Sequence, residues 1–454
     1  MTGRAGLTGG PRPGSAELAR SSPRGSWLTP GSPVVRAARL VIVPMAALAL
    51  VPVLLTELHF FPIRDLVGAT IPDTIYLEHA AQGLVQGHQP YGTNFLTAPD
   101  GRLVFVYPPL SLLLALPALL AGADYSFGLA LELLVLLGLG LWLLGWGCRR
   151  SGISFPAVLL IGLLLLAMGP VLVTRVDALQ GLALAGAALA LRSRRTALAV
   201  ALVALATLAK ETVVVAALPV VVWSLWPPPG SRWRSGLGHR VGAVLLGLIP
   251  AATLLLIFGI WSAGRVLNSA GASINRGVEI ESVPAVISAL LRPIFPLTVS
   301  TGKLASVQVS GAEVTWVATV VALVGVAALV WGAVHFARAR CQPATAIAFA
   351  LAVGLAATPV FSPQYLLALM PVLVLAACTE AGPARGRLLL LLGLLLGLLT
   401  QVEFPYLFSS VDVLAPLGTA VVVARNLLLI VTAVTLARSH PAPPAESNRA
   451  ASPR

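Results

Sequence analysis

The chain has 454 residues and a formal net charge of +13, and 57% of its residues are hydrophobic while only 10% are charged. Apolar runs of about 15–25 residues recur along it, which excludes a set of soluble domains and indicates a polytopic helical membrane protein. The positive charge does not indicate a nucleic-acid partner, because the cations flank apolar runs and no basic run alternates with aromatic residues. Lysine is scarce beside arginine, and Ala, Gly and Pro are abundant, which is typical of a GC-rich bacterial genome.

Both ends of the chain are predicted to be disordered cytoplasmic tails. Residues 1–35 are rich in Gly, Pro, Ser and Arg, and residues 438–454 form the second tail. The first apolar run lacks a small-residue cleavage site, so it is interpreted as an uncleaved signal-anchor helix. Residues 36–437 form the predicted membrane domain. The three cysteines, Cys148, Cys341 and Cys378, indicate neither a disulfide framework nor a metal site.

The apolar runs predict an all-α bundle of about 12 transmembrane helices, with a range of about 11–13. Twelve crossings place both termini in the cytoplasm and put most cations on that side, as the positive-inside rule requires. Several runs are shorter than the roughly 20 residues that cross a bilayer, which is tolerated where helix ends line a water-filled cavity. The predicted spans are 36–56, 125–147, 154–174, 177–191, 195–209, 211–226, 238–262, 313–336, 344–358, 363–378, 387–404 and 413–437.

One further apolar run, residues 104–122, does not fit as a crossing. As a thirteenth span it would move Arg149 and Arg150 to the other side of the membrane. The charge distribution favours a re-entrant or interfacial helix that opens at Tyr107-Pro108-Pro109. Two large loops, 57–124 and 263–312, then lie outside, and most acidic residues collect there or at the outer helix ends. We therefore expect any chemistry to face outward.

The first outer loop contains a predicted amphipathic helix over residues 73–87. Its apolar stripe and its polar face repeat with helical spacing, which is typical of a helix lying at the membrane interface. Gly87 is expected to end it. Asp73 follows Pro72 at the start of this helix, where the helix dipole favours a carboxylate. From the local sequence alone, Asp73 is interpreted as an N-cap. The stripe comprises Tyr76, Leu77, Ala80, Ala81, Leu84 and Val85, and the polar face Glu78, His79, Gln82 and Gln86.

Charged residues interrupt the apolar pattern at two later places. Arg175 and Asp177 stand between two spans, where they either form an ion pair that closes a helical hairpin or line a polar cavity. Lys210 separates two short apolar runs, and an ionisable residue at membrane depth points to function. Pairing of Lys210 with its neighbour Glu211 is the structural alternative.

Two further segments carry polar residues at helix starts. In the second outer loop, Arg276 offers a planar fork suited to a phosphate, and Ser282 is expected to N-cap the helix that follows. In Ser362-Pro363-Gln364-Tyr365, the serine and proline predict another helix start. That role leaves Gln364 and Tyr365 available to face a cavity.

Taken together, these motifs resemble the GT-C superfamily of polyprenol-dependent glycosyltransferases, and in particular glycosyltransferase family 87. The likeness covers residues of about 60–370. The segments that carry it are Pro72-Asp73-Thr74-Ile75-Tyr76, Gly87, Pro90-Tyr91, Tyr107-Pro108-Pro109, Arg175-Val176-Asp177, Lys210, Arg276 to Ser282 and Ser362-Pro363-Gln364-Tyr365.

The resemblance implies transfer of a hexose, with mannose favoured, from a polyprenyl phosphate to a glycolipid or cell-envelope polysaccharide at the outer face of a bacterial plasma membrane. Asp73 is then the general base, with Glu78 in reserve, and the reaction inverts the anomeric carbon. Lys210, Arg276 and Arg175 are implied to bind the donor phosphate. The implied scheme needs no metal and no further cofactor. Residues implied to line the cavity are Tyr76, Glu78, Tyr107, Asp177, Gln364 and Tyr365.

Two other functions remain open at this point. A transporter or flippase for lipid-linked sugars would fit a polytopic protein, but the chain shows no convincing internal repeat and its charges gather at the outer surface. A degenerate family member that serves as a scaffold is the third possibility. The absence of a P-loop and of a dinucleotide-binding fingerprint favours a sugar donor carried on lipid.

Overall fold

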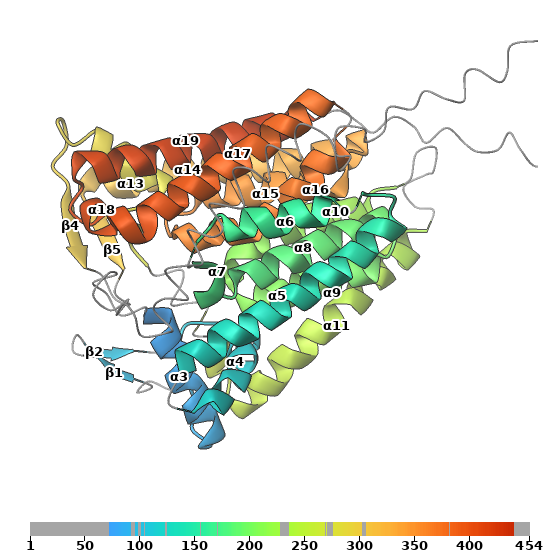
Figure 1. Cartoon of the computed structure of the whole chain (residues 1–454), viewed down its shortest axis with the longest axis horizontal. Helices are drawn as coiled ribbons and strands as arrows, with labels where there is room; N and C mark the ends of the chain where they lie inside the picture. Colours follow the sequence, from blue (N-terminus) through green and yellow to red (C-terminus); the bar gives the residue numbers. More distant parts are fainter. Residues whose placement is uncertain are drawn as a thin grey trace, which may run out of the picture.

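The computed structural model describes residues 72–91, 96–98, 101–103, 105–122, 125–154, 156–169, 171–227, 236–267, 269, 276–301, 306–380 and 382–439. The predicted span 36–56 and nearly all of both predicted tails lie outside these residues. The described part is a bundle of helices with short strands at one end (Figure 1).

Each predicted span within the described residues contains a helix, but the predicted span 154–174 is broken into α6 and α7, and α18 was not predicted. The main helices of the bundle are α5 (Tyr125–Arg150), α6 (Pro156–Leu166), α8 (Asp177–Arg192), α9 (Thr196–Ala209), α10 (Ala217–Leu225), α11 (Leu237–Trp261), α14 (Ala312–Ala339), α15 (Pro343–Ala357), α16 (Leu366–Thr379), α17 (Pro383–Gln401) and α19 (Pro416–Ala437). The remaining helical segments are α3 (Pro72–Val85), α4 (Pro109–Ala115), η2 (Pro117–Ala121), α7 (Val171–Thr174), η3 (Glu211–Ala216), η4 (Arg265–Leu267), α13 (Val283–Leu290), η6 (Pro363–Tyr365), η7 (Val402–Leu407) and α18 (Phe408–Val411).

The count of twelve crossings is not supported. Among the described residues, five helices are long and apolar enough to cross a membrane: α5, α11, α14, α17 and α19. The other apolar helices have 10–17 residues, and at 1.5 Å per residue they fall short of a hydrocarbon core of about 30 Å. The chain is thus a helical membrane protein with a mixture of long outer and short inner helices.

The bundle has two chemically different ends. Successive helices alternate in direction, so the starts of α8, α14, α16 and α19 lie at the end that carries the strands, α3 and α13 (Figure 1). We call this the strand end. Arginines gather at the opposite helix ends, where Arg192 donates to Gln342 and Arg340 donates to the carbonyl of Trp226. The strand end holds the acidic groups described below.

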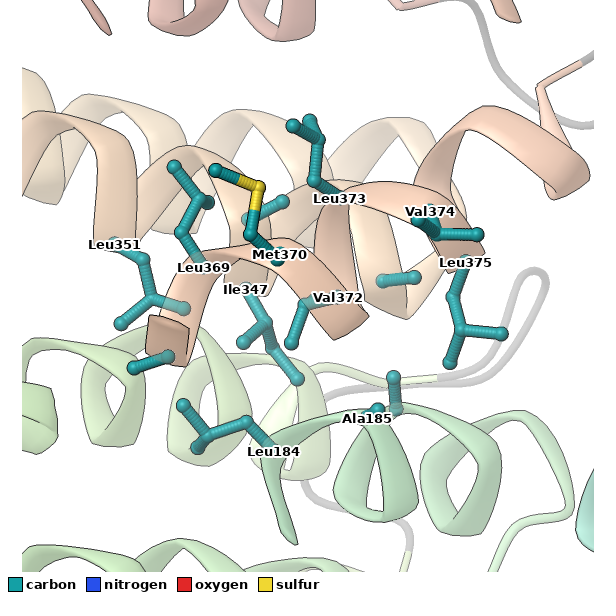
Figure 2. Packing of buried hydrophobic residues seen from close by; sticks show 14 of the residues in the cluster. Leu184, Ala185, Ile347, Leu351, Leu369, Met370, Val372, Leu373, Val374 and Leu375 are labelled. Carbon is teal, nitrogen blue, oxygen red and sulfur yellow. The ribbon is translucent and has the colours of Figure 1, made fainter. Parts of the chain in front are cut away.

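Helix α16 forms the centre of the main hydrophobic core. Nearly all of its side chains are buried, and they pack against α8 and α15 (Figure 2). Gly181 permits the close crossing of α8 over α16, because a Cβ there would lie 2.6 Å from the carbonyl oxygen of Leu367. Gly393 and Gly397 also face inward, toward α16 and toward the turn that follows α6, respectively. Their spacing therefore serves packing within the chain.

Helix α3 largely follows its predicted amphipathic pattern. Leu77, Ala80 and Ala81 are buried in a second core cluster with residues of α4 and α5. Gly87 adopts a φ of +79°, and the amide of His88 donates to the carbonyl of Gly83, which ends the helix. Val85, at the end of the predicted apolar stripe, is 71% exposed and so does not pack against the rest of the protein. The buried face of α3 is thus covered by protein.

The run 104–122 forms two short helical pieces, α4 and η2, which meet at Leu116 and Pro117. Proline at the start of η2 removes a helical hydrogen bond and favours this break. Neither piece has the length of a span, which favours the re-entrant or interfacial helix over a thirteenth crossing. Both long loops also contain strands, which the apolar pattern did not predict. They are the hairpin β1 (Leu96–Ala98) and β2 (Gly101–Leu103), and the antiparallel sheet β3 (Val278–Glu279), β5 (Val307–Ser310) and β4 (Thr298–Thr301).

Candidate active site

A buried ion pair stands at the strand end of α8 and α9. Nζ of Lys210 lies 3.1 Å from Oδ2 of Asp177, and the two side chains are 5% and 0% exposed. Desolvating two charges is costly unless each has a partner, so this pair depends on its geometry. The two residues are 33 positions apart, and the antiparallel packing of α8 and α9 brings them together.

The helical backbone is interrupted at Lys210, one member of this pair. Helix α9 ends at Ala209, and Lys210 is extended (φ −165°, ψ 134°) before the chain turns into η3. The carbonyls left at the end of α9 need partners. Gln180 supplies them, because its Nε2 donates to the carbonyls of Ala206 and Lys210, each at 2.7 Å. Asp177 opens α8, where the helix dipole favours its charge.

Two tyrosine rings flank the Lys210 ammonium. It lies 4.8 Å from the ring centroid of Tyr365 and 5.6 Å from that of Tyr107, within the range of a cation–π contact. Tyr91 holds Tyr107, since its hydroxyl donates to the Tyr107 carbonyl at 3.1 Å. Burial raises the pKa of Tyr91 far above its usual value, which keeps this phenol a donor. The Pro90-Tyr91 and Tyr107-Pro108-Pro109 motifs thus support one ring beside Lys210.

Arg276 belongs to the same region. It pairs with Glu279 at 3.4 Å and is 21% exposed. The charges of Arg276 and Glu279 act on the Tyr365 phenol, as do those of Asp177 and Glu211, so these four groups lie within electrostatic reach of one phenol. The backbone supports the arrangement, because the amide of Glu279 donates to the carbonyl of Pro359, three residues before Ser362.

Both predicted helix starts near this site are confirmed. Ser282 caps α13 by accepting a hydrogen bond from the amide of Ala285, and Ser362 with Pro363 opens η6 ahead of α16. The hydroxyl of Ser362 also donates to Oε1 of Gln364 at 2.6 Å. Gln364 is therefore oriented by its own turn.

The remaining predicted residues are placed as follows. Asp73 lies in the first turn of α3, but its side chain is outside the described residues. Glu78 accepts from Gln82 and acts electrostatically on Tyr125; within the described residues no contact joins it to Lys210. Tyr76, on α3, and Arg175, between α7 and α8, are half-buried.

The two structural alternatives for Lys210 and Asp177 are thereby resolved in part. Pairing of Lys210 with Glu211 is wrong, because its carboxylate partner is Asp177. The hairpin interpretation of Asp177 missed that it binds a residue from another loop. Asp177 and Lys210 interrupt the apolar pattern at two separate places in the sequence, and in the structure they form one ion pair.

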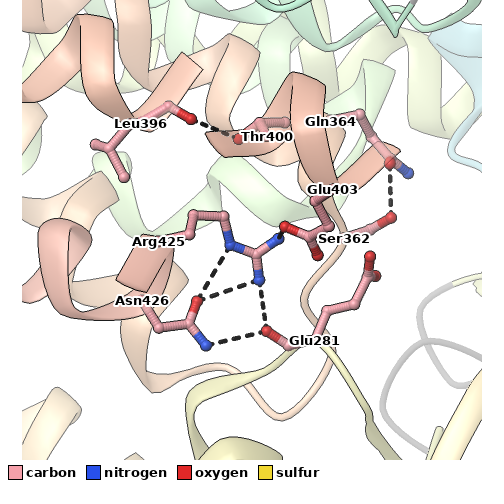
Figure 3. A network of polar contacts seen from close by, with 8 residues as sticks. All are labelled: Glu281, Ser362, Gln364, Leu396, Thr400, Glu403, Arg425 and Asn426. Carbon is pink, nitrogen blue, oxygen red and sulfur yellow. Dashed lines mark hydrogen bonds and ion pairs between the residues drawn. The ribbon is translucent and has the colours of Figure 1, made fainter. Parts of the chain in front are cut away.

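A second charged cluster, around Arg425, was not predicted from the sequence (Figure 3). It is linked to the first through the contact between the rings of Phe361 and Tyr365. Arg425 of α19 is fully buried and pairs with Glu403 of η7, and its guanidinium lies 4.4 Å from the ring of Phe361. Glu281 lies next to Glu403, and burial and the Glu403 charge hold the pKa of the Glu281 carboxyl well above its usual range. The available signal was Arg425 itself, a cation inside the apolar run 413–437.

The arrangement can bind an anion. An ammonium carries three donors, and Asp177 takes one donor of Lys210. In a site of low dielectric, cations held by buried partners stabilise negative charge more strongly than they would in water. Within the described chain, no group of three His, Cys, Asp or Glu residues has metal-binding geometry.

One comparison with known proteins gives a match. The family model described as glycosyltransferase family 87 matches residues 105–363, more than half of the chain. The matched segment includes Tyr107, Asp177, Lys210, Arg276 and the first residue of η6, and it stops before α16–α19. No curated protein and no solved structure matched the chain.

Proposed function

The chain belongs to glycosyltransferase family 87, and we propose that it transfers a hexose, with mannose favoured, from a polyprenyl phosphate to a glycolipid or cell-envelope polysaccharide. The observation that carries this proposal is the Lys210–Asp177 pair, which is buried at one end of the helix bundle. The charges of Asp177 and Arg276 both act on the phenol of Tyr365. A donor on a lipid carrier keeps its tail in the bilayer, while its phosphate reaches a polar site at the helix ends.

Lys210 and Arg276 would stabilise the departing lipid phosphate. Bond cleavage at the anomeric carbon leaves negative charge on the phosphate oxygens, and preorganised cations lower the energy of that transition state. Asp177 keeps the Lys210 ammonium in place, and the rings of Tyr107 and Tyr365 limit its movement. Arg175, at the start of the same helix hairpin, is the third proposed phosphate ligand.

Asp73 is the proposed general base. It would take the proton of the acceptor hydroxyl as that oxygen attacks the anomeric carbon, which inverts the configuration; assistance of this kind contributes about 10²–10⁴-fold. Its position in the first turn of α3 suits an ionised carboxylate. Glu78, one turn further along, is the reserve base.

The strand end is proposed to face outward. Arginines concentrate at the opposite helix ends, and the positive-inside rule assigns that side to the cytoplasm. Both termini would then be cytoplasmic, and the site would open toward the periplasmic side of a bacterial plasma membrane. This orientation suits an acceptor that belongs to the cell envelope.

The decisive experiment compares two acid variants of α3. Purified protein is incubated with radiolabelled polyprenyl-phosphate-mannose and a membrane lipid extract, and transfer is measured after lipid extraction. Asp73→Asn should abolish transfer while membrane insertion and the yield stay normal, and Glu78→Gln, five residues away on α3, serves as the matched control. Full turnover by Asp73→Asn would remove the proposed base. Loss of transfer only in Glu78→Gln would move the role to the reserve residue.

A further inference from the structure

Arg425 and Asn426 lie beyond the family match, yet they contact the loop that carries Arg276. Both are on α19, and their side chains are 0% and 3% exposed. Nη2 of Arg425 donates to the backbone carbonyl of Glu281 at 2.6 Å, and Nδ2 of Asn426 donates to the same oxygen at 3.1 Å. Two donors from one helix therefore hold one carbonyl of the loop (Figure 3).

The guanidinium of Arg425 is itself fixed on several sides. Its Nη1 pairs with Glu403, and its Nε and Nη2 donate to Oδ1 of Asn426 at 3.3 and 3.1 Å. The planar fork of arginine can make these bonds at once, whereas a lysine ammonium presents a single point charge. A buried charge with this many partners is rigidly placed, and removing any partner leaves costly unpaired groups.

The clamped carbonyl lies within a short segment that has little freedom. Glu279 pairs with Arg276 and donates its amide to Pro359. The amide of Ile280 donates to the carbonyl of Val307, and Ser282 caps α13. Residues 279–282 are therefore held by β5, by the segment before η6 and by α19. Of these three supports, α19 alone lies outside the family match.

We propose that Arg425 and Asn426 are positioning residues that fix the Arg276 loop for binding of the donor phosphate. The role rests on the proposed function, since it places a proposed phosphate ligand. Neither residue touches the donor; each acts through the backbone of Glu281. The expected consequence of loosening the clamp is weaker donor binding with unchanged acceptor binding.

Two variants test the clamp in the full-length protein. Asn426→Asp keeps the oxygen that accepts from Arg425 and removes the donor to Glu281, and Arg425→Lys keeps the charge beside Glu403 and removes the fork. Thr432→Val is the control, because Thr432 is buried on the same helix and donates only to the carbonyl of Leu428 in its own helix. KM is measured separately for labelled polyprenyl-phosphate-mannose and for the acceptor lipid. Amide hydrogen exchange of residues 276–285 is measured without substrate.

Both clamp variants should raise the donor KM about 10- to 100-fold, the range expected when a binding group is misplaced. The acceptor KM should stay within about twofold, and exchange of residues 276–285 should quicken about tenfold, because the carbonyl of Glu281 loses a donor. The control should change neither quantity. Unchanged donor KM and unchanged exchange in Asn426→Asp would overturn the proposal. A lower yield with unchanged donor KM in both variants would show a purely structural role and would also overturn it.

The exchange measurement separates this proposal from the proposed function. If the wild-type chain transfers no sugar from the labelled donor, the proposed function fails for that donor. Faster exchange of residues 276–285 in Asn426→Asp would still support the clamp, and unchanged exchange would reject it.

Discussion

Neutralising both members of the Lys210–Asp177 pair separates its contribution to folding from its contribution to catalysis. In Lys210→Met, the carboxylate of Asp177 stays buried without its ammonium partner. Breaking a buried pair in this way costs about 3–5 kcal/mol of unfolding free energy. The side chains are almost fully buried, so solvent does not screen this loss.

The double variant Lys210→Met/Asp177→Asn removes both charges and should regain most of that stability. Two smaller losses remain. Asp177 at the start of α8 gives up a helix-dipole interaction of about 0.3–1 kcal/mol. Lys210 gives up its contact with the ring of Tyr365, worth about 1 kcal/mol. We therefore expect the double variant to be about 1–2 kcal/mol less stable than wild type, and clearly more stable than Lys210→Met.

Activity should not follow stability. The folded double variant lacks the ammonium that stabilises the leaving phosphate, and loss of one such group lowers kcat about 10²–10³-fold. Denaturant unfolding in detergent, followed by tryptophan fluorescence, gives the stability, and transfer from labelled polyprenyl-phosphate-mannose gives kcat. Wild-type turnover in the double variant would refute the role of Lys210 at the phosphate. Wild-type stability in Lys210→Met would refute the energetic importance of the pair.

Three further predictions concern the scaffold. Gly181→Ala should destabilise the fold by about 1–3 kcal/mol, because the new methyl group would collide with the carbonyl of Leu367; Gly138→Ala, with open space around it, is the control in the same thermal unfolding assay. Tyr91→Phe should cost about 0.5–1.5 kcal/mol through loss of the hydrogen bond to Tyr107, and an unchanged Tm would contradict it. Burial raises the pKa of Asp412 to about 6, so the folded state holds its proton more tightly than the unfolded state, and stability falls as pH rises from about 4 to about 6. Asp412→Asn should therefore raise Tm at pH 7.5, by an amount equivalent to about 1 kcal/mol after allowing for partial exposure, and should leave Tm unchanged at pH 4.

Apolar runs in the sequence located the helices, because each helix is built from a largely continuous apolar segment. The predicted run 238–262 corresponds to α11, and 313–336 corresponds to α14. These apolar runs did not give the crossing count, since helices such as α6 and α9 are too short to cross although their sequences are as apolar as those of the five candidate spans. Inner helices are shielded by their neighbours and so need no lipid-matched length. The short strands were missed because they lie in polar loops where no period is visible.

Local signals predicted the helix caps well and the partners poorly. Ser282 and Gly87 act on their own turns, so the sequence nearby contains the whole interaction. Glu211 was the alternative partner considered for Lys210 because that residue is adjacent, whereas the actual partner comes from the start of α8. A buried charged side chain pairs with a group that the fold brings close to it, and that group need not be near in the sequence.

The alternating direction of successive helices would have predicted part of this pairing. Helices that reverse at every turn return to the same end of the bundle after each pair, so the start of α8 and the end of α9 must share an end. Asp177 and Lys210 occupy those two positions, and α8 and α9 are neighbours in both sequence and space. Direction alone would therefore have suggested their pairing. Alternating helix direction also places Glu281, Glu403 and the start of α19 at the strand end. Helix direction alone does not predict that Arg425 donates to the carbonyl of Glu281, because that contact depends on which helices distant in sequence become neighbours.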